Sequence, residues 1–439
     1  MAIRSAALLV ATICAALTLP LIRAQQAYDK RQQERVQQMA RDLADALRKH
    51  YYDPTYHGLD MDARFRAADE QIQKGVNLGQ GYGAIAEALD ALNDSHTFFL
   101  PPSRPVRLES GFILQMVGEL CFITAVRPGA DAQEKLAPGD QVISWQGFAP
   151  KRATLWKIDY ATNRLASATV QQFAIRRPDG SERYVEVKLK VKQLKRVLDL
   201  TSDADYYQMI RDEENSERLN RHEFREMADG PMIWKMPEFD LNEDGVERLI
   251  KQARRHPALV VDLRGNPGGL VRTLQDLVGS VMDHDVTIAT RKGRKPDLKP
   301  MVAKTRHSAA FAGKLIVLVD SRSASAAELF ARVVQLEHRG TVLGDHSSGS
   351  VMESRHYPFS QGTDTKFFYG ASITEADLIM GDGMSLEHNG VVPDEVILPT
   401  PADLAAGRDP VLARAVQLAG GKMNAVQAGR LFPVEWQPE

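Results

Sequence analysis

The sequence has little cysteine, no excess of either charge and a single long apolar run. Of its 439 residues two are cysteines, Cys14 and Cys121, and Cys14 lies within the apolar run at the N-terminus. If that run is removed, Cys121 is left alone and no internal disulfide can form. The 55 basic and 57 acidic side chains give a net charge of -2. No overall field therefore attracts nucleic acid or an anionic membrane surface, and we expect no nucleic-acid partner.

Two further absences narrow the class of protein. The sequence contains no cysteine–histidine cluster with metal-ligand spacing, so we expect neither a metal nor another cofactor. It also contains no internal repeat and no low-complexity tract. The 44% of hydrophobic and 26% of charged residues are ordinary for a soluble protein that buries a core. A length of 439 residues suggests two or three domains.

The apolar run has the form of a secretory signal peptide. Residues 1–4 carry one positive charge, residues 5–22 are almost purely apolar, and Ala24 precedes a polar stretch. This pattern predicts a signal peptide at residues 1–24 and an exported protein, periplasmic or secreted, without a stable membrane span after cleavage. The alternative is an uncleaved membrane anchor, because the run approaches the roughly 20 residues that a spanning helix needs.

Residues 25–104 follow helical periodicity. Apolar side chains recur at spacings of three and four, as in Val36, Met39, Leu43 and Leu47. The last helix runs into Leu-Asn-Asp-Ser-His-Thr at residues 92–97, and prolines follow at 101 and 102. Because proline must leave helical geometry, His96 is expected just beyond a helix end. Such connections often present functional side chains.

Residues 105–195 change to a strand pattern. The order of a strand, Pro-Gly-Ala, a short helix, Leu-Ala-Pro-Gly-Asp and a second strand looks like a PDZ domain. PDZ-like modules bind an extended chain by adding it as a strand to a sheet edge. The alternative is a small β-domain that only packs against the rest of the protein. Residues 196–230 form a charged connector, interpreted as a solvated helix or linker.

From residue 231 onward short apolar strands alternate with helices. Ala-Leu-Val-Val-Asp-Leu at residues 258–263 and Leu-Ile-Val-Leu-Val at 315–319 are the most apolar of the strands. Such repeats predict an α/β layer with largely parallel strands. We place this domain at residues 231–402 and a C-terminal helix and tail at residues 403–439.

In open α/β sheets, sites form just past the carboxyl ends of the strands. One such end reads Asp-Leu-Arg-Gly-Asn-Pro-Gly-Gly at residues 262–269. Gly268 and Gly269 allow backbone geometry that is closed to other residues, and their N–H groups could point at an oxyanion. A tight strand-to-helix turn is the structural alternative.

A second strand end leads into a helix that begins near Ser325. Ser325 and Glu328 have the spacing of a capping box, which is a purely structural interpretation. A serine at a helix start also lies beside unpaired N–H groups and the positive end of the helix dipole. The same groups would stabilise an oxyanion formed when Ser325 attacks a carbonyl carbon.

These segments, together with Glu-His-Asn-Gly-Val-Val-Pro-Asp at residues 387–394, stand in one order along the chain. From about residue 35 to 420 the chain resembles the tail-specific (C-terminal-processing) serine peptidases. The resemblance implies a multidomain α/β protein with an N-terminal helical region, a PDZ-like β-domain and a catalytic domain of the tail-specific or tricorn-core (ClpP/crotonase-like) type. In that family the serine of Ser-Ala-x-Glu is the nucleophile, which maps to Ser325.

The chain departs from this family at the general base. Tail-specific members use a lysine in a Gly-Lys-Gly segment, where this sequence has Ser350, and no lysine occurs between Lys314 and Lys366. The tricorn branch uses a histidine instead, and its site implies His96 as base with Ser95 and Glu387 in support. The resemblance further implies backbone N–H groups of Ala326 and of Gly268 or Gly269 as the oxyanion hole.

Two functional alternatives remain at this point. The first is an exported serine endopeptidase that hydrolyses protein or peptide substrates through an acyl-enzyme. The second is an inactive relative that binds peptides or small apolar ligands. The loss of the lysine is the feature that raises this alternative. His346 is the second candidate for the base, since it lies in the loop that would carry the lysine. His388, next to Glu387, is interpreted as a surface residue, and Cys121 as part of a buried strand.

Overall fold

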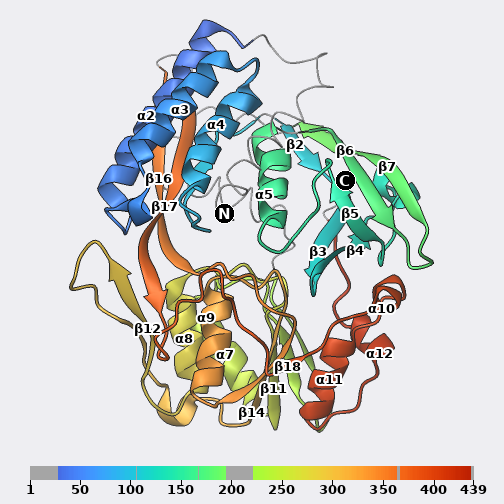
Figure 1. The fold of residues 1–439 in the computed structure, drawn as a ribbon. Coiled ribbons are helices and arrows are strands. Elements are labelled where there is room, and N and C mark those ends of the chain that lie inside the picture. The colour runs from blue at the N-terminus through green and yellow to red at the C-terminus, as the bar shows by residue number, and fades with distance from the viewer. Residues whose placement is uncertain (1–27, 105, 167, 194–220, 363–365, 437–439) are drawn as a thin grey trace.

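The computed structural model describes residues 28–104, 106–166, 168–193, 221–362 and 366–436. Figure 1 shows a layer of helices, a small β-sheet unit beside it and an α/β unit that meets both. The expected signal peptide at residues 1–24 and most of the expected connector lie outside the described residues. Within the described ranges, no helix has the length and apolar character that a membrane crossing requires.

The helical layer contains α2 (Lys30–His50), α3 (Met61–Lys74) and α4 (Leu78–Asp90). Each helix begins where a polar side chain accepts a hydrogen bond from the N–H of the third helical residue; these caps are Asp29, Asp60 and Asn77. The apolar positions predicted from the sequence, Val36, Met39, Leu43 and Leu47, are buried. Three helices thus lie in the stretch where the sequence shows helical periodicity.

The small unit is an antiparallel sheet whose five strands neighbour one another in chain order. They are β3 (Phe112–Val117), β4 (Leu120–Val126), β5 (Gln141–Trp145), β6 (Val170–Arg176) and β7 (Glu182–Lys188). Helix α5 (Leu155–Asp159) and a π-helical turn (Tyr160–Ala166) connect β5 to β6, and β2 (Val106–Glu109) pairs with β8 (Lys190–Gln193). Cys121 is buried in β4, as expected, and burial raises the pKa of its thiol to about 12.

The α/β unit is built on a six-stranded sheet in the order β18-β15-β14-β11-β10-β9. Its parallel strands are β10 (Met232–Lys235), β11 (Ala258–Asp262), β14 (Lys314–Val319), β15 (Gly340–Gly344) and β18 (Glu395–Val396). Strand β9 (Glu223–Glu226) adds an antiparallel edge. The interpretation of these four residues as helix or linker was wrong, because an exposed edge strand can carry charged side chains without an apolar pattern.

Both faces of this sheet are covered, which explains why its central strands β11 and β14 are almost entirely apolar. In β11, Leu259 and Val261 pack into a core shared with helices on one face, whereas Val260 joins the core on the other. The first face carries α7 (Glu243–Ala253), α8 (Val271–Val281) and α9 (Ala326–Leu336). The second carries α11 (Pro410–Leu418) and α12 (Ala425–Gly429), and the short α10 (Pro401–Ala405) precedes them.

A second sheet, which the sequence did not predict, connects the α/β unit to the helical layer. It contains β1 (Phe98–Leu100), β12 (Val286–Gly293), β13 (Met301–Ala303), β16 (Met352–Gln361) and β17 (Phe367–Ile379). The last residues of β17 pair with β12, and residues 370–372 pair with β1. Figure 1 shows β17 rising from the α/β unit beneath the helices. This pairing brings the segment just before β1 to the α/β unit.

A buried ion pair joins the helical layer to the small β unit. Lys157 Nζ on α5 lies 2.5 Å from Asp90 Oδ1 at the end of α4, and the side chains are only 4% and 6% exposed. We expect Lys157→Ala to lower the free energy of unfolding by about 3–5 kcal/mol, because the Asp90 carboxylate would be left buried without its counter-ion. Urea unfolding followed by circular dichroism measures this difference.

The double variant Lys157→Met/Asp90→Leu is the control for that prediction. It removes both charges and fills the space with apolar atoms, so most of the lost stability should return. A Lys157→Ala variant that unfolds at the wild-type urea concentration would show that the pair contributes nothing.

Candidate active site

Ser325 lies in the turn between β14 and α9. It is the N-cap residue of α9 and has φ 54°, in the left-handed region. Residues with a side chain adopt such angles rarely, and this kind of strain clusters at functional sites. The turn is fixed by the Ser325 N–H, which donates to the Ser350 carbonyl at 2.8 Å and to Glu328 Oε2 at 3.1 Å. The Glu328 half of the expected capping box is therefore present.

The glycine pair that follows β11 packs directly against this turn. Gly268 and Gly269 have φ 104° and 135°, which glycine alone adopts without cost. A Cβ atom on Gly268 would lie 2.6 Å from Ser325 Cβ and 3.0 Å from the Ala326 nitrogen. The two strand ends singled out in the sequence thus meet. The two glycines are not equivalent as hydrogen-bond donors, since the Gly268 N–H already donates to Asn266 Oδ1 at 2.8 Å.

Asn266 is the residue that holds the glycine turn in place. Its side chain is fully buried, and its Nδ2 donates to the Met236 carbonyl at 2.9 Å while Oδ1 accepts from Gly268. Its own carbonyl accepts the Ala324 N–H at 2.9 Å, one residue before Ser325. The sequence alone assigns Asn266 no role. A polar residue inside an otherwise glycine-rich turn was the available signal, because buried amides need several partners.

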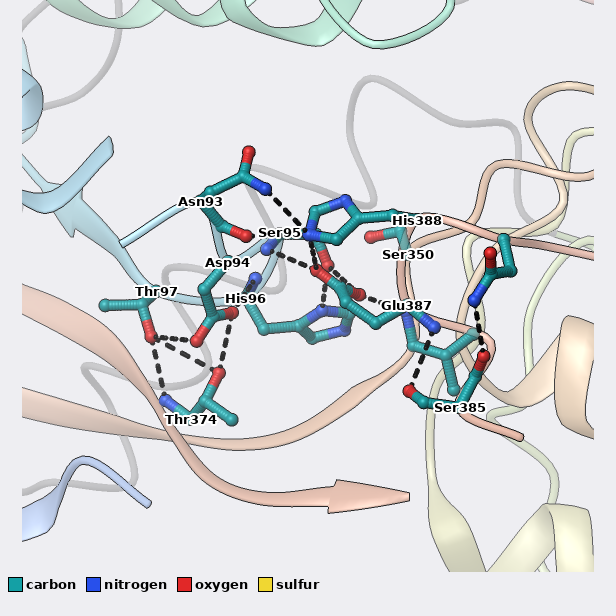
Figure 2. A network of polar contacts seen from close by, with 12 residues as sticks. Asn93, Asp94, Ser95, His96, Thr97, Ser350, Thr374, Ser385, Glu387 and His388 are labelled. Carbon is teal, nitrogen blue, oxygen red and sulfur yellow. Dashed lines mark hydrogen bonds and ion pairs between the residues drawn. The ribbon is translucent and has the colours of Figure 1, made fainter. Parts of the chain in front are cut away.

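The segment that carries His96 is anchored by the buried carboxylate of Asp94. This carboxylate accepts hydrogen bonds from the His96 N–H at 2.8 Å, the Thr97 hydroxyl at 2.9 Å and the Thr374 hydroxyl at 2.8 Å. Thr374 belongs to β17, so the bonds tie the segment to the second sheet (Figure 2). The motif at residues 92–97 contains Asp94, but the sequence alone does not indicate this function.

Ser95, His96 and Glu387 form one hydrogen-bonded relay. The Ser95 hydroxyl donates to Glu387 Oε2 at 2.8 Å and lies 2.7 Å from His96 Nδ1, while the Ser95 N–H donates to Glu387 Oε1 at 2.8 Å. Figure 2 shows Glu387 reaching this segment from the opposite side of the site. A hydroxyl has a single proton, so Ser95 must accept from Nδ1–H of His96. The neutral ring then presents a lone pair on Nε2.

Burial shifts the proton affinities of this relay. Desolvation lowers the pKa of His96 below its ordinary value, and the nearby Asp94 carboxylate opposes that shift. Desolvation also raises the pKa of Glu387, against the hydrogen bonds that it accepts from the Ser95 and Val351 N–H groups. The imidazole is consequently neutral near pH 7, the state in which it can take a proton.

A short backbone segment joins the relay to the Ser325 turn. The Val351 N–H donates to Glu387 Oε2 at 2.8 Å, and the preceding residue, Ser350, accepts the Ser325 N–H through its carbonyl at 2.8 Å. Figure 2 places Ser350 beside Glu387. The segment that binds the carboxylate of the relay is thus the same segment that binds the backbone of Ser325.

The other two histidines considered, His346 and His388, are exposed on the surface. His346 is exposed, and its backbone N–H donates to Asp345 while its carbonyl accepts from Arg152. His388 is an exposed residue, as expected, and its Nε2 lies 2.7 Å from the Asn93 carbonyl. Across the residues that the structure describes, no group of three or more His, Cys, Asp and Glu side chains could hold a metal ion.

A serine at a strand–turn–helix junction, packed against a glycine turn and near a histidine–carboxylate relay, is an arrangement that serine hydrolases use. Residues 233–397 match the sequence profile of peptidase family S41. The match spans most of the α/β unit, and this part of the chain is therefore similar to the peptidases of family S41. The matched residues include Ser325 and Glu387, whereas Ser95 and His96 precede them.

Individual proteins show the same similarity. The chain is 32% identical to a tricorn protease homolog of Streptomyces coelicolor over 179 residues, which is 39% of this chain and 14% of that protein. It is 26% identical to the tail-specific protease of Haemophilus influenzae over 326 residues, which is 69% of this chain and 43% of that protein. The chain therefore spans less than half the length of either relative.

Among solved structures, mature CPAF shares this fold. The two superpose with a TM-score of 0.62 at 15% identity, covering 85% of this chain and 94% of CPAF. This similarity supports the mixed α/β architecture of the fold.

Proposed function

We propose that this protein is an exported serine endopeptidase that hydrolyses peptide bonds through an acyl-enzyme. Ser325 is the nucleophile, His96 is the general base, and Ser95 and Glu387 support the base. The observation that carries the proposal is the relay of Ser95 between His96 Nδ1 and Glu387, which directs the free lone pair of the imidazole to Nε2. The relay is bonded to the segment that also holds the Ser325 backbone.

The reaction uses these groups in sequence. His96 Nε2 takes the hydroxyl proton as Ser325 attacks the carbonyl carbon, and the resulting imidazolium keeps its Nδ1–H bond to Ser95. Glu387 supplies negative charge two hydrogen bonds away from the ring and so stabilises the imidazolium. His96 then protonates the leaving amine, after which water cleaves the acyl-enzyme by the same route.

The oxyanion hole is assigned to the N–H groups of Ala326 and Gly269. Ala326 is the first residue of α9, so its N–H has no partner within the helix. Gly269 is preferred to Gly268 because the Gly268 N–H is held by Asn266. Gly268 contributes instead by lacking a side chain, which lets the glycine turn approach Ser325.

Two wider assignments belong to the same proposal. The five-stranded unit is interpreted as a PDZ-like module at residues 105–195 that influences access of protein or peptide substrates. It reaches the strand ends of the α/β unit, where Gln115 on β3 donates to Asp320 at 2.7 Å and Arg152 contacts Asp345 at 2.7 Å. Export is inferred from the apolar run at residues 1–24.

Labelling with a fluorophosphonate tests the function directly. The reagent forms a stable phosphonyl ester with an activated serine, so we expect one labelled peptide containing Ser325 in digests analysed by mass spectrometry. Ser325→Ala should lose both the label and the hydrolysis of a denatured protein substrate, by about 10⁴-fold or more. Ser181→Ala, which changes an exposed serine in the turn between β6 and β7, should keep both. A wild-type protein that is folded but not labelled would favour the inactive, ligand-binding alternative.

A further inference from the structure

Glu328 is a buried carboxylate that makes far more hydrogen bonds than a helix cap requires. It lies in the first turn of α9 with a side chain that is fully buried. Its Oε1 accepts from the Ser347 hydroxyl at 2.5 Å and the Gly349 N–H at 2.8 Å, and its Oε2 accepts from the N–H groups of Ser350 at 2.9 Å and Ser325 at 3.1 Å. Each oxygen therefore has two donors, which is the full capacity of a carboxylate.

These four donors come from two segments. One donor is the N–H of Ser325 itself, and the other three belong to residues 347–350, in the loop that follows β15. A capping box alone would use the bond to the Ser325 N–H and leave the rest of the carboxylate to water. Here three of the four bonds reach across to the loop, so the carboxylate joins the nucleophile turn to that loop.

The loop is held on its other side by the second carboxylate of the site. Glu387 accepts the N–H of Val351, the residue directly after Ser350. Residues 349–351 thus lie between Glu328, which binds the Ser325 backbone, and Glu387, which binds Ser95 of the base relay. Any shift of these three residues would move the nucleophile and the base relative to each other.

We propose that Glu328 is a positioning residue of the peptidase, which sets the separation of Ser325 and His96 by fixing residues 349–351 between two carboxylates. It acts through the backbone and touches neither the substrate nor the reacting atoms. This inference rests on the proposed function, since it assigns a second role within the same site.

The geometry explains why a carboxylate is needed at this position. A glutamine has the same shape but carries one NH₂ group, which cannot accept a hydrogen bond. In one orientation that group would face the N–H of Gly349, and in the other it would face those of Ser350 and Ser325. Either arrangement leaves a buried N–H group without an acceptor and pushes the loop away.

The test compares Glu328→Gln with the wild-type enzyme in steady-state hydrolysis of a denatured protein substrate. We expect kcat to fall about 10- to 100-fold while KM changes less than about twofold, because positioning is lost but substrate contacts remain. The rate of fluorophosphonate labelling should fall in parallel with kcat. Asp276→Asn is the matched control, since it alters another carboxylate of the same unit, one that bonds to Arg306 and not to the loop or to Ser325. It should lower the thermal midpoint without changing kcat.

Ser347→Ala provides a second variant in case Glu328→Gln does not fold. It removes one of the four donors and leaves the three backbone N–H groups in place, so kcat should fall by about three- to tenfold in a folded protein. Wild-type kcat in a folded Glu328→Gln protein, or in Ser347→Ala where the former does not fold, would overturn the inference. A wild-type protein whose Ser325 is not labelled would instead overturn the proposed function, and the positioning role with it.

Discussion

Replacing His96 by alanine is expected to lower kcat for peptide hydrolysis by about 10⁴-fold or more, with little change in KM. Ser325 would keep its turn and its oxyanion donors but would lose the group that removes its proton. The hydroxyl of serine is a poor nucleophile without such a base. Hydrolysis of a denatured protein substrate, together with the rate of fluorophosphonate labelling, measures the loss.

His346→Ala is the control for that experiment. His346 lies in the loop where the related lysine enzymes carry their base, but its side chain is exposed and its contacts are made by its backbone. We expect kcat within about twofold of the wild type, because surface substitutions away from a site have small effects. Retention of activity in His96→Ala and its loss in His346→Ala would reassign the base to the loop.

Replacing Glu387 by glutamine is expected to lower kcat by about 10³- to 10⁴-fold. In the proposed mechanism, the change removes the charge that stabilises the imidazolium of His96 through Ser95. It also places an NH₂ group opposite donors that now bind the carboxylate, either the Ser95 N–H or the pair formed by the Ser95 hydroxyl and the Val351 N–H. KM should change little, since Glu387 acts behind the base rather than on the substrate.

Glu353→Gln controls for the loss of a glutamate charge near the site. Glu353 lies on β16, two residues beyond Val351, and its Oε2 is 2.7 Å from the Arg291 guanidinium. Its replacement breaks an ion pair without touching the relay, so stability should fall while kcat is kept. If Glu387→Gln were as active as Glu353→Gln, the relay through Ser95 would have no part in catalysis.

Much of the secondary structure could be predicted because it depends on local periodicity. The spacing of Val36, Met39, Leu43 and Leu47 indicated a helix, and the apolar runs at residues 258–263 and 315–319 indicated buried parallel strands; the structure confirms both. Strand β9 was missed because its charged residues show no apolar pattern. The pairing of β1 with β17 joins residues more than two hundred positions apart, and no short-range signal records such a partner. The PDZ-like identity of the small unit stays a prediction.

The residues of the candidate site also fall into two groups, those that sequence motifs predict and those that only the structure reveals. The motifs supplied Ser325, His96, Glu387 and the glycine pair, because each stands in a recognisable segment. They gave no role to Asn266, Asp94 or Glu328, whose importance depends on what each carboxylate or amide oxygen meets in space. The sequence indicates Glu328 only as half of a capping box, because three of its four donors come from about twenty residues further along the chain.

By itself the sequence determined which residues can perform the chemistry, since side-chain types and short motifs are properties of the chain alone. The absence of a lysine near Ser350 also favoured a histidine as the general base. Only the tertiary structure decided that Ser95 lies between His96 and Glu387 and that the Gly268 N–H donates to Asn266. It also decided that residues 349–351 connect the carboxylates of Glu328 and Glu387. Hydrogen bonds depend on distances of a few tenths of an ångström between distant segments, and packing alone fixes those distances.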